Sequence, residues 1–250
     1  MSKIVFLTWV AGLAAAVTCA AEPIVAPEPK AGSPADSALE AVTPEGWNVG
    51  AGYSLERRSL LLGGAVHDFS DWRSTVWLGY KPVRWLAVEA GAGASRGKLD
   101  GDKGELGLDW LARVRFNLAE YVIERSPVLG KQQSVRLGGV LSYEASESND
   151  ATADFAWREL LASPTVSYNV NLRGPGNWHP YDAVATGLRL GLLFSRIEGE
   201  RGADDLQENR NFGLSAGAYL QFSGGSVLDV DLRTYGSDDQ VLVFALTYNL

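Results

Sequence analysis

Residues 210–250 read "RNFGLSAGAYLQFSGGSVLDVDLRTYGSDDQVLVFALTYNL" and close the chain. Apolar residues alternate with small or polar ones across the first thirteen positions of this stretch, at Phe212, Leu214, Ala216, Ala218, Leu220 and Phe222. A period of two is the pattern of a β-strand with one apolar and one polar face. The pattern recurs twice before the chain ends. The stretch therefore predicts three consecutive strands, each of which needs a cover for its apolar face.

The same alternation begins at Trp47 and predicts ten strands. We place them near residues 47–56, 72–81, 85–96, 105–118, 134–144, 160–172, 186–197, 211–222, 226–235 and 241–250. In the seventh, the apolar face is Leu188, Leu190, Leu192 and Phe194. Eight or twelve strands also fit, because residues 119–133 are long for a turn and residues 59–69 could continue a strand.

Strand length decides between a sandwich and a barrel. Sandwich strands typically run about 5–6 residues, whereas these run about ten to fourteen. Ten residues at roughly 3.3 Å each, tilted by about 40°, span close to 25 Å, the height of the apolar band of an outer-membrane barrel. In lipid an open sheet edge would leave unpaired backbone groups, so the sheet must close. We predict an all-β, closed antiparallel transmembrane barrel over residues 46–250, with lipid on the apolar face.

The connections between predicted strands differ in charge. Residues 57–71, 98–104, 145–158, 198–209 and 236–239 together hold 14 acids and 6 bases, and residues 82–84, 119–133, 173–185 and 223–225 hold 3 acids and 4 bases. Outer-membrane barrels have long external loops and short periplasmic turns. The first set is therefore predicted to be external, which places the N-terminus in the periplasm.

The N-terminus has the features of an export signal. Lys3 precedes an apolar run over residues 4–17, and small residues follow at Ala20 and Ala21. We predict a signal peptide over residues 1–20, with Cys19 as an acylated first residue as the alternative. Residues 21–45 are rich in proline and alanine and predict a disordered linker, either a periplasmic tether or a spacer.

The chain resembles the Gram-negative outer-membrane β-barrel superfamily, in particular its small OmpA-type and porin-like members. The resemblance rests on the alternating strands, on turns such as that in residues 80–95, and on the closing "LVFALTYNL". It implies residence in the outer membrane, contact with membrane lipid and lipopolysaccharide, and insertion by the outer-membrane assembly machinery. Members usually end in an aromatic residue, whereas this chain ends in Leu250.

Candidate catalytic groups are few. His67 stands beside Asp68, which is similar to the rim of the omptin proteases, but adjacent strand residues point to opposite sides. Residues 198–209 are acidic but lack the ligand spacing of a calcium loop. We expect no enzyme activity, no metal and no cofactor. The acidic balance, 30 Asp and Glu against 22 Lys and Arg, argues against nucleic acid as a partner.

Inward-facing charges are the most informative set. By strand parity they are Glu89, Asp109, Arg113, Arg115, Arg136, Glu144, Arg189, Asp229, Asp231 and Arg233. Five acids meet five bases, so the interior can pair internally. Glu89, Asp109 and Glu144 are the expected partners of Arg113 and Arg115. These groups form either a salt-bridged plug or the lining of a narrow pore.

The expected function is therefore a monomeric structural or narrow porin-like barrel that passes small solutes at most slowly. An adhesin or recognition barrel acting through acidic external loops is the alternative, and an outer-rim hydrolase is the third hypothesis.

Overall fold

A computed structural model describes residues 46–83, 85–100, 102–126, 131–149, 154–171 and 182–250. The predicted signal peptide and linker lie outside these residues. The described chain contains strands and no helix that is long and apolar enough to cross a membrane. The strands are β1 (Gly46–Leu62), β2 (Ala65–Val83), β3 (Leu86–Leu99), β4 (Asp102–Lys103), β5 (Gly107–Ser126), β6 (Lys131–Asn149), β7 (Asp154–Asn171), β8 (Ala183–Arg201), β9 (Asp204–Glu208), β10 (Phe212–Phe222), β11 (Ser226–Thr234) and β12 (Gln240–Asn249).

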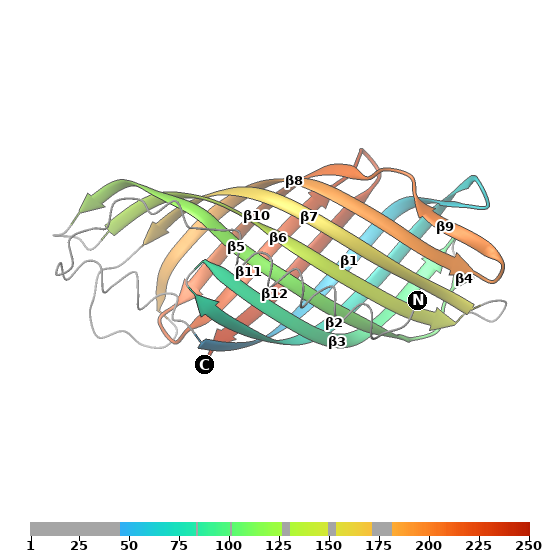
Figure 1. Cartoon of the computed structure of the whole chain (residues 1–250), viewed down its shortest axis with the longest axis horizontal. Coiled ribbons are helices and arrows are strands. Elements are labelled where there is room, and N and C mark those ends of the chain that lie inside the picture. Colours follow the sequence, from blue (N-terminus) through green and yellow to red (C-terminus); the bar gives the residue numbers. More distant parts are fainter. Residues whose placement is uncertain (1–45, 84, 101, 127–130, 150–153, 172–181) are drawn as a thin grey trace. The chain divides into compact units, whose positions relative to one another are not determined.

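Ten of these strands close into an antiparallel barrel (Figure 1). Each pairs with the next along the chain, β8 pairs with β10, and β12 returns to pair with β1 from Asn48↔Asn249 to Arg57↔Gln240. The short strands β4 and β9 are additions to this ring. The predicted fold class and the prediction of ten strands are confirmed.

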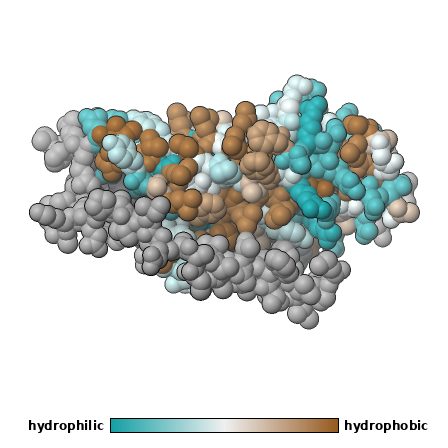
Figure 2. Space-filling view, turned by 45° about the horizontal axis from the view of Figure 1, so that its top comes forward, coloured by the Kyte–Doolittle hydropathy of each residue, from teal (hydrophilic) through white to brown (hydrophobic). Residues whose placement is uncertain are grey.

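The outer surface of the barrel carries the apolar face of every long strand. Leu188, Leu190, Leu192 and Phe194 are 44–67% exposed, as expected for side chains that meet lipid. Trp47, Tyr80, Tyr168 and Tyr248 are also exposed near the end of the barrel at which the chain enters and leaves. Figure 2 shows apolar side chains gathered over the middle of the wall and a hydrophilic zone toward the end where β9 lies. An apolar band with interfacial aromatic residues is the exterior of a transmembrane barrel.

The wall is uneven at the end opposite Gly46 and Leu250, here called the outer end. Strands β10, β11 and β12 have 9–11 residues, whereas β1, β2, β6, β7 and β8 have 17–19. Above the three short strands, β9 pairs with β8 on one side and with β1 on the other, at Leu60↔Glu208 to Leu62↔Leu206. One strand thus replaces three, and the ring narrows from ten strands to eight.

The interior of this eight-stranded part is apolar. Leu60, Phe69, Leu99, Phe155, Trp157, Ile197 and Leu206 form a buried cluster, here called the outer seal. Phe69 packs edge-on against Trp157 with ring centroids 5.8 Å apart. Eight strands give an interior that side chains can fill. Apolar side chains therefore pack together inside the barrel at its outer end.

Several predicted loops are strands in the structure. The prediction of a loop over residues 57–71 is wrong, because β1 and β2 continue to a two-residue turn at Gly63 and Gly64. The φ values of these glycines, 57° and 86°, suit a tight hairpin. Most of residues 145–158 and 198–209 are also strand, and so is most of residues 119–133. At the outer end the strands continue beyond the apolar band, and there the inward-facing positions become apolar.

Candidate functional site: the charged lumen

The first group of inward charges lies on β3 and β5. Glu89 sits opposite Arg113 in the β3–β5 register and is 2% exposed. Its Oε2 accepts a hydrogen bond from Arg113 Nε at 2.6 Å, and its Oε1 accepts one from Arg115 Nε at 2.9 Å. One carboxylate thus holds two neighbouring guanidiniums that would otherwise repel each other.

Trp77 fills the lumen beside this group. Arg113 lies over its ring at 4.9 Å from the centroid, and the indole is buried. Gly50 and Gly52 on β1 make room for it, because a Cβ at either position would collide with the indole. The glycines of β1 therefore allow a large aromatic ring to occupy the interior.

The second group joins β8 to β11. Arg189 Nη2 lies 2.9 Å from Asp229 Oδ1 and 3.4 Å from Asp231 Oδ1. Asp231 Oδ2 also accepts a hydrogen bond from Arg233 Nε at 3.1 Å. A separate pair, Arg136 Nε to Glu120 Oε1 at 3.0 Å, is partly exposed. The predicted inward charges of β8 and β11 are thus brought together along the inner face of the wall.

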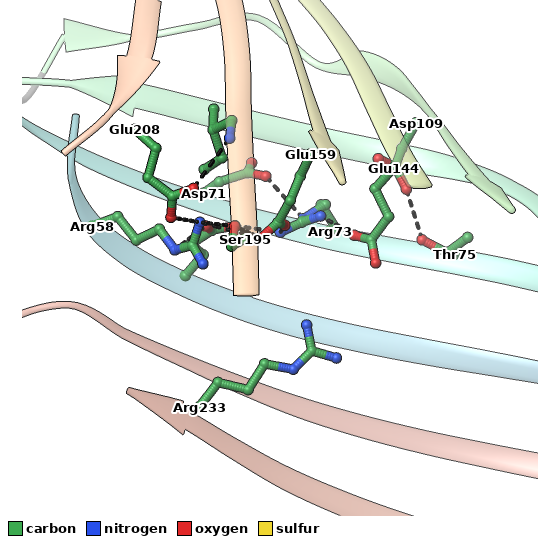
Figure 3. A network of polar contacts seen from close by, with 12 residues as sticks. Arg58, Asp71, Arg73, Thr75, Asp109, Glu144, Glu159, Ser195, Glu208 and Arg233 are labelled. Carbon is green, nitrogen blue, oxygen red and sulfur yellow. Dashed lines mark hydrogen bonds and ion pairs between the residues drawn. The ribbon is translucent and has the colours of Figure 1, made fainter. Parts of the chain in front are cut away.

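A larger network lies beneath the outer seal, here called the central charge cluster (Figure 3). It consists of Glu56, Arg58, Asp71, Arg73, Asp109, Glu144, Glu159, Glu208 and Arg233, with Ser195. Its members come from β1, β2, β5, β6, β7, β8, β9 and β11. The cluster therefore ties most of the wall together at one level.

Arg73 is the central cation on β2. It pairs with Glu56 and with Glu144, and its Nε lies 3.2 Å from Asp71 Oδ2. Its guanidinium lies over the Trp157 ring at 4.7 Å from the centroid, and its side chain is 4% exposed. Arg73 thus connects the charge cluster below to the outer seal above.

Arg58 holds the side of the cluster near β9. Its Nη1 lies 3.1 Å from Glu159 Oε1 and 3.0 Å from Glu208 Oε1, and it donates a hydrogen bond to Ser195 Oγ at 3.1 Å. Ser195 Oγ in turn donates to Glu159 at 2.7 Å. Burial raises the pKa of Glu208, on the short strand β9, to about 7 against the opposing effect of Arg58.

Carboxyl groups outnumber guanidiniums in the central charge cluster. Six carboxyl groups face Arg58, Arg73 and Arg233. Asp109 accepts a hydrogen bond from Thr75 Oγ1 at 2.9 Å, while its Oδ1 and Asp71 Oδ1 have no hydrogen-bond partner among the described residues. Asp109 and Glu144 were expected beside Arg113 and Arg115, but they lie in this cluster. Among the described residues, Glu89 is the carboxylate that pairs with the two arginines.

Six of the nine charged residues of this network were not predicted from the sequence. Glu56 and Arg73 were placed in strands without being assigned to the lumen, and Glu159 was likewise overlooked. Arg58, Asp71 and Glu208 were assigned to loops. Strand parity contained the signal. Asn48, Gly50, Gly52, Ser54, Glu56 and Arg58 share one face of β1, which continues without interruption to Leu60. Following that parity into the supposed loop would have found Arg58.

The outer rim carries the histidine that the sequence singled out. His67 Nδ1 lies 2.5 Å from Asp100 Oδ2 in the β3–β4 turn, rather than pairing with the adjacent Asp68. Asp100 has a φ of 51° and also accepts a hydrogen bond from the Asp68 amide at 2.9 Å. The hydrogen bond from His67 lowers the pKa of Asp100. No group of metal-binding side chains occurs among the described residues.

Comparisons with solved structures return barrels. The translocator domain of the autotransporter NalP from Neisseria meningitidis is 15% identical, with a TM-score of 0.41 over 86% of this chain and 93% of that one. The chain is a transmembrane β-barrel of the outer-membrane type. This assignment stands on the closed sheet and its apolar band.

Other solved barrels align at similar levels. The outer-membrane protease OmpT from Escherichia coli is 8% identical, with a TM-score of 0.37 over 83% of this chain and 97% of that one. The transport unit of the autotransporter AIDA-I from Escherichia coli is 8% identical, with a TM-score of 0.38 over 86% and 97%. No family model and no curated protein sequence matches the chain.

Proposed function

We propose that this protein is a structural outer-membrane barrel whose lumen is a plug, and that it conducts no solute at a measurable rate. The observation that carries the proposal is the outer seal, in which Leu60, Phe69 and Trp157 fill the eight-stranded end of the barrel. A hydrated ion would have to displace packed side chains there. The proposal includes no catalytic step.

The central charge cluster supports the plug. Charged groups in a pore are separated by water, whereas Arg73 contacts three carboxyl groups directly and its side chain is 4% exposed. Breaking a buried pair by removing one partner leaves an uncompensated charge and is strongly unfavourable. Opening a path between Arg58 and Arg73 would require such losses at several pairs together.

A planar-bilayer recording of the refolded barrel tests this proposal. We expect a flat baseline from preparations whose heat-modifiable gel migration shows folded barrel and whose insertion is verified by protease protection. Discrete, ohmic current steps that scale with the amount of inserted barrel would overturn the plug and favour the narrow porin-like alternative.

A further inference from the structure

Three cations lie on the outward face of the wall where the apolar band ends. Arg57 on β1 and Arg96 on β3 are exposed, and Lys98 on β3 is half-buried. Each is flanked by residues that face the interior, such as Glu56 and Arg58 on either side of Arg57, so strand alternation directs all three cations outward. We call Arg57, Arg96 and Lys98 the basic triad.

The register of the sheet brings the basic triad together. Arg57 pairs with Ser70 on β2, and Ser70 pairs with Lys98 on β3, so the two cations lie on one row across three strands. At about 4.8 Å between strands, their Cα atoms are about 10 Å apart. Arg96 is two residues along β3 on the same face, opposite Trp72.

The basic triad has no anionic partner among the residues that the structure describes. The side chains of Arg57, Arg96 and Lys98 form no ion pair among the described residues. The outward arginines on the other side of the barrel differ, because Glu198 lies 3.0 Å from Arg158 and 2.5 Å from Arg196. The triad therefore concentrates three cations at one place on the wall, with no ion pair within the described part of the chain.

An apolar platform lies directly on the membrane side of the triad. Leu55 precedes Arg57 by two residues on the same face of β1 and pairs with Trp72. Tyr53 stacks on Trp72 with ring centroids 6.3 Å apart. A ligand with anionic groups above and hydrocarbon below would match this surface in both chemistry and vertical order.

We propose that the basic triad binds the phosphate groups of lipid A, the anchor of lipopolysaccharide, with acyl chains lying over Leu55, Tyr53 and Trp72. Arginine suits phosphate because its planar fork donates two parallel hydrogen bonds. The triad lies toward the outer end of the barrel, which the predicted topology assigns to the outer leaflet. This site is independent of whether the lumen conducts.

Native mass spectrometry of the full barrel in zwitterionic detergent tests the site, with bis-phosphorylated lipid A as the probe. We expect the combined variant Arg57→Gln, Arg96→Gln and Lys98→Gln to bind lipid A at least tenfold more weakly than the wild type. The control variant Arg158→Gln with Arg196→Gln removes two outward cations that are already paired and should bind as the wild type does. Heat-modifiable migration verifies that both variants are folded.

Two further ligands identify what is recognised. Dephosphorylated lipid A should bind the wild type about as weakly as lipid A binds the triad variant, since the phosphates supply the contact. Phosphatidylglycerol should bind at least tenfold more weakly than lipid A. Equal binding of lipid A to wild type and triad variant overturns the site, and equal binding of phosphatidylglycerol and lipid A overturns its assignment to lipopolysaccharide.

Discussion

The wall of this barrel has opposite polarity in lipid and beyond it, and β8 shows both cases on one strand. Within the band, Leu190 and Leu192 point outward. A few residues later Arg196 points outward, and Ile197 points into the outer seal. Strand parity is unchanged throughout, so what has changed is the surrounding solvent. In lipid the apolar face must be outside, whereas in water it must be inside.

The same reversal occurs on β1. Glu56 and Arg58 point inward with the charge cluster, while Leu60, on the same face, belongs to the outer seal. The boundary lies at the level where the apolar band ends and the basic triad begins. Paired charges therefore lie in the lower lumen beside a second buried apolar cluster of Leu161, Leu193, Tyr235 and Val241, and the outer seal fills the upper lumen.

Among the variants considered, removal of a buried guanidinium should lower the free energy of unfolding most. Arg73→Ala leaves Glu56, Asp71 and Glu144 without their shared cation, and we expect a loss of about 3–5 kcal/mol of unfolding free energy. Urea titration in lipid vesicles measures it. Arg196→Ala, which removes an outward and mostly exposed arginine, should cost at most about 1 kcal/mol. Similar losses in the two variants would contradict the difference between the two faces.

A cavity in the outer seal should cause the next largest loss of unfolding free energy. Leu60 is fully buried, so Leu60→Ala should cost about 3 kcal/mol through lost apolar burial and a residual cavity. Leu55→Ala, on the lipid face of the same strand, should cost less because lipid can fill the space. If Leu55→Ala proves the more damaging change in the same urea titration, the interior of the upper barrel is not packed as described.

A charge placed on the lipid face should locate the boundary. Leu190→Arg should cost about 2–4 kcal/mol, the range for arginine at the bilayer midplane. Glu200→Arg lies on the same face of β8 but ten residues further out, and we expect almost no change in the urea midpoint. A comparable cost at both positions would show that lipid extends over the outer part of β8.

A smaller effect is expected from pH. The pKa of Glu208 is about 7 in the folded barrel against an ordinary value of 4.5, so between these values the folded state keeps a proton that the unfolded state releases. The contribution of Glu208 to stability should therefore decrease as pH rises from about 5 to 7. Glu208→Gln should flatten this slope in urea midpoints measured from pH 5 to pH 8, and an unchanged slope would assign it to other groups.

The fold was predictable because lipid imposes a simple rule on the sequence. Leu188, Leu190, Leu192 and Phe194 occupy every second position inside the band, and such patterns predicted the faces of the strands and the closure of the sheet. The rule ends where lipid ends. Around Leu60 the inward face becomes apolar and the sequence "SLLLGG" loses its alternation, so the continuing strands were assigned to loops.

The charged site was predictable only in part, for the same reason. Glu89, Arg113 and Arg189 lie well inside the band, where parity identified them. Arg58 and Asp71 lie at its edge, inside a segment assigned to a loop. The replacement of three strands by β9 depends on contacts between distant parts of the chain, and local alternation contains no signal for it.

Thiol accessibility at Ser146 tests the closed lumen most directly. Ser146 is 1% exposed, hydrogen-bonds to Ser95 on the inner face of the wall, and pairs in register with Trp157 of the outer seal. A Ser146→Cys variant in a Cys19→Ser background should resist a charged, water-soluble thiol reagent in the folded barrel and react fully in urea. Ser237→Cys, at the exposed β11–β12 turn, should react in both states. Modification of the folded Ser146→Cys barrel at a rate near that of Ser237→Cys would contradict a sealed lumen.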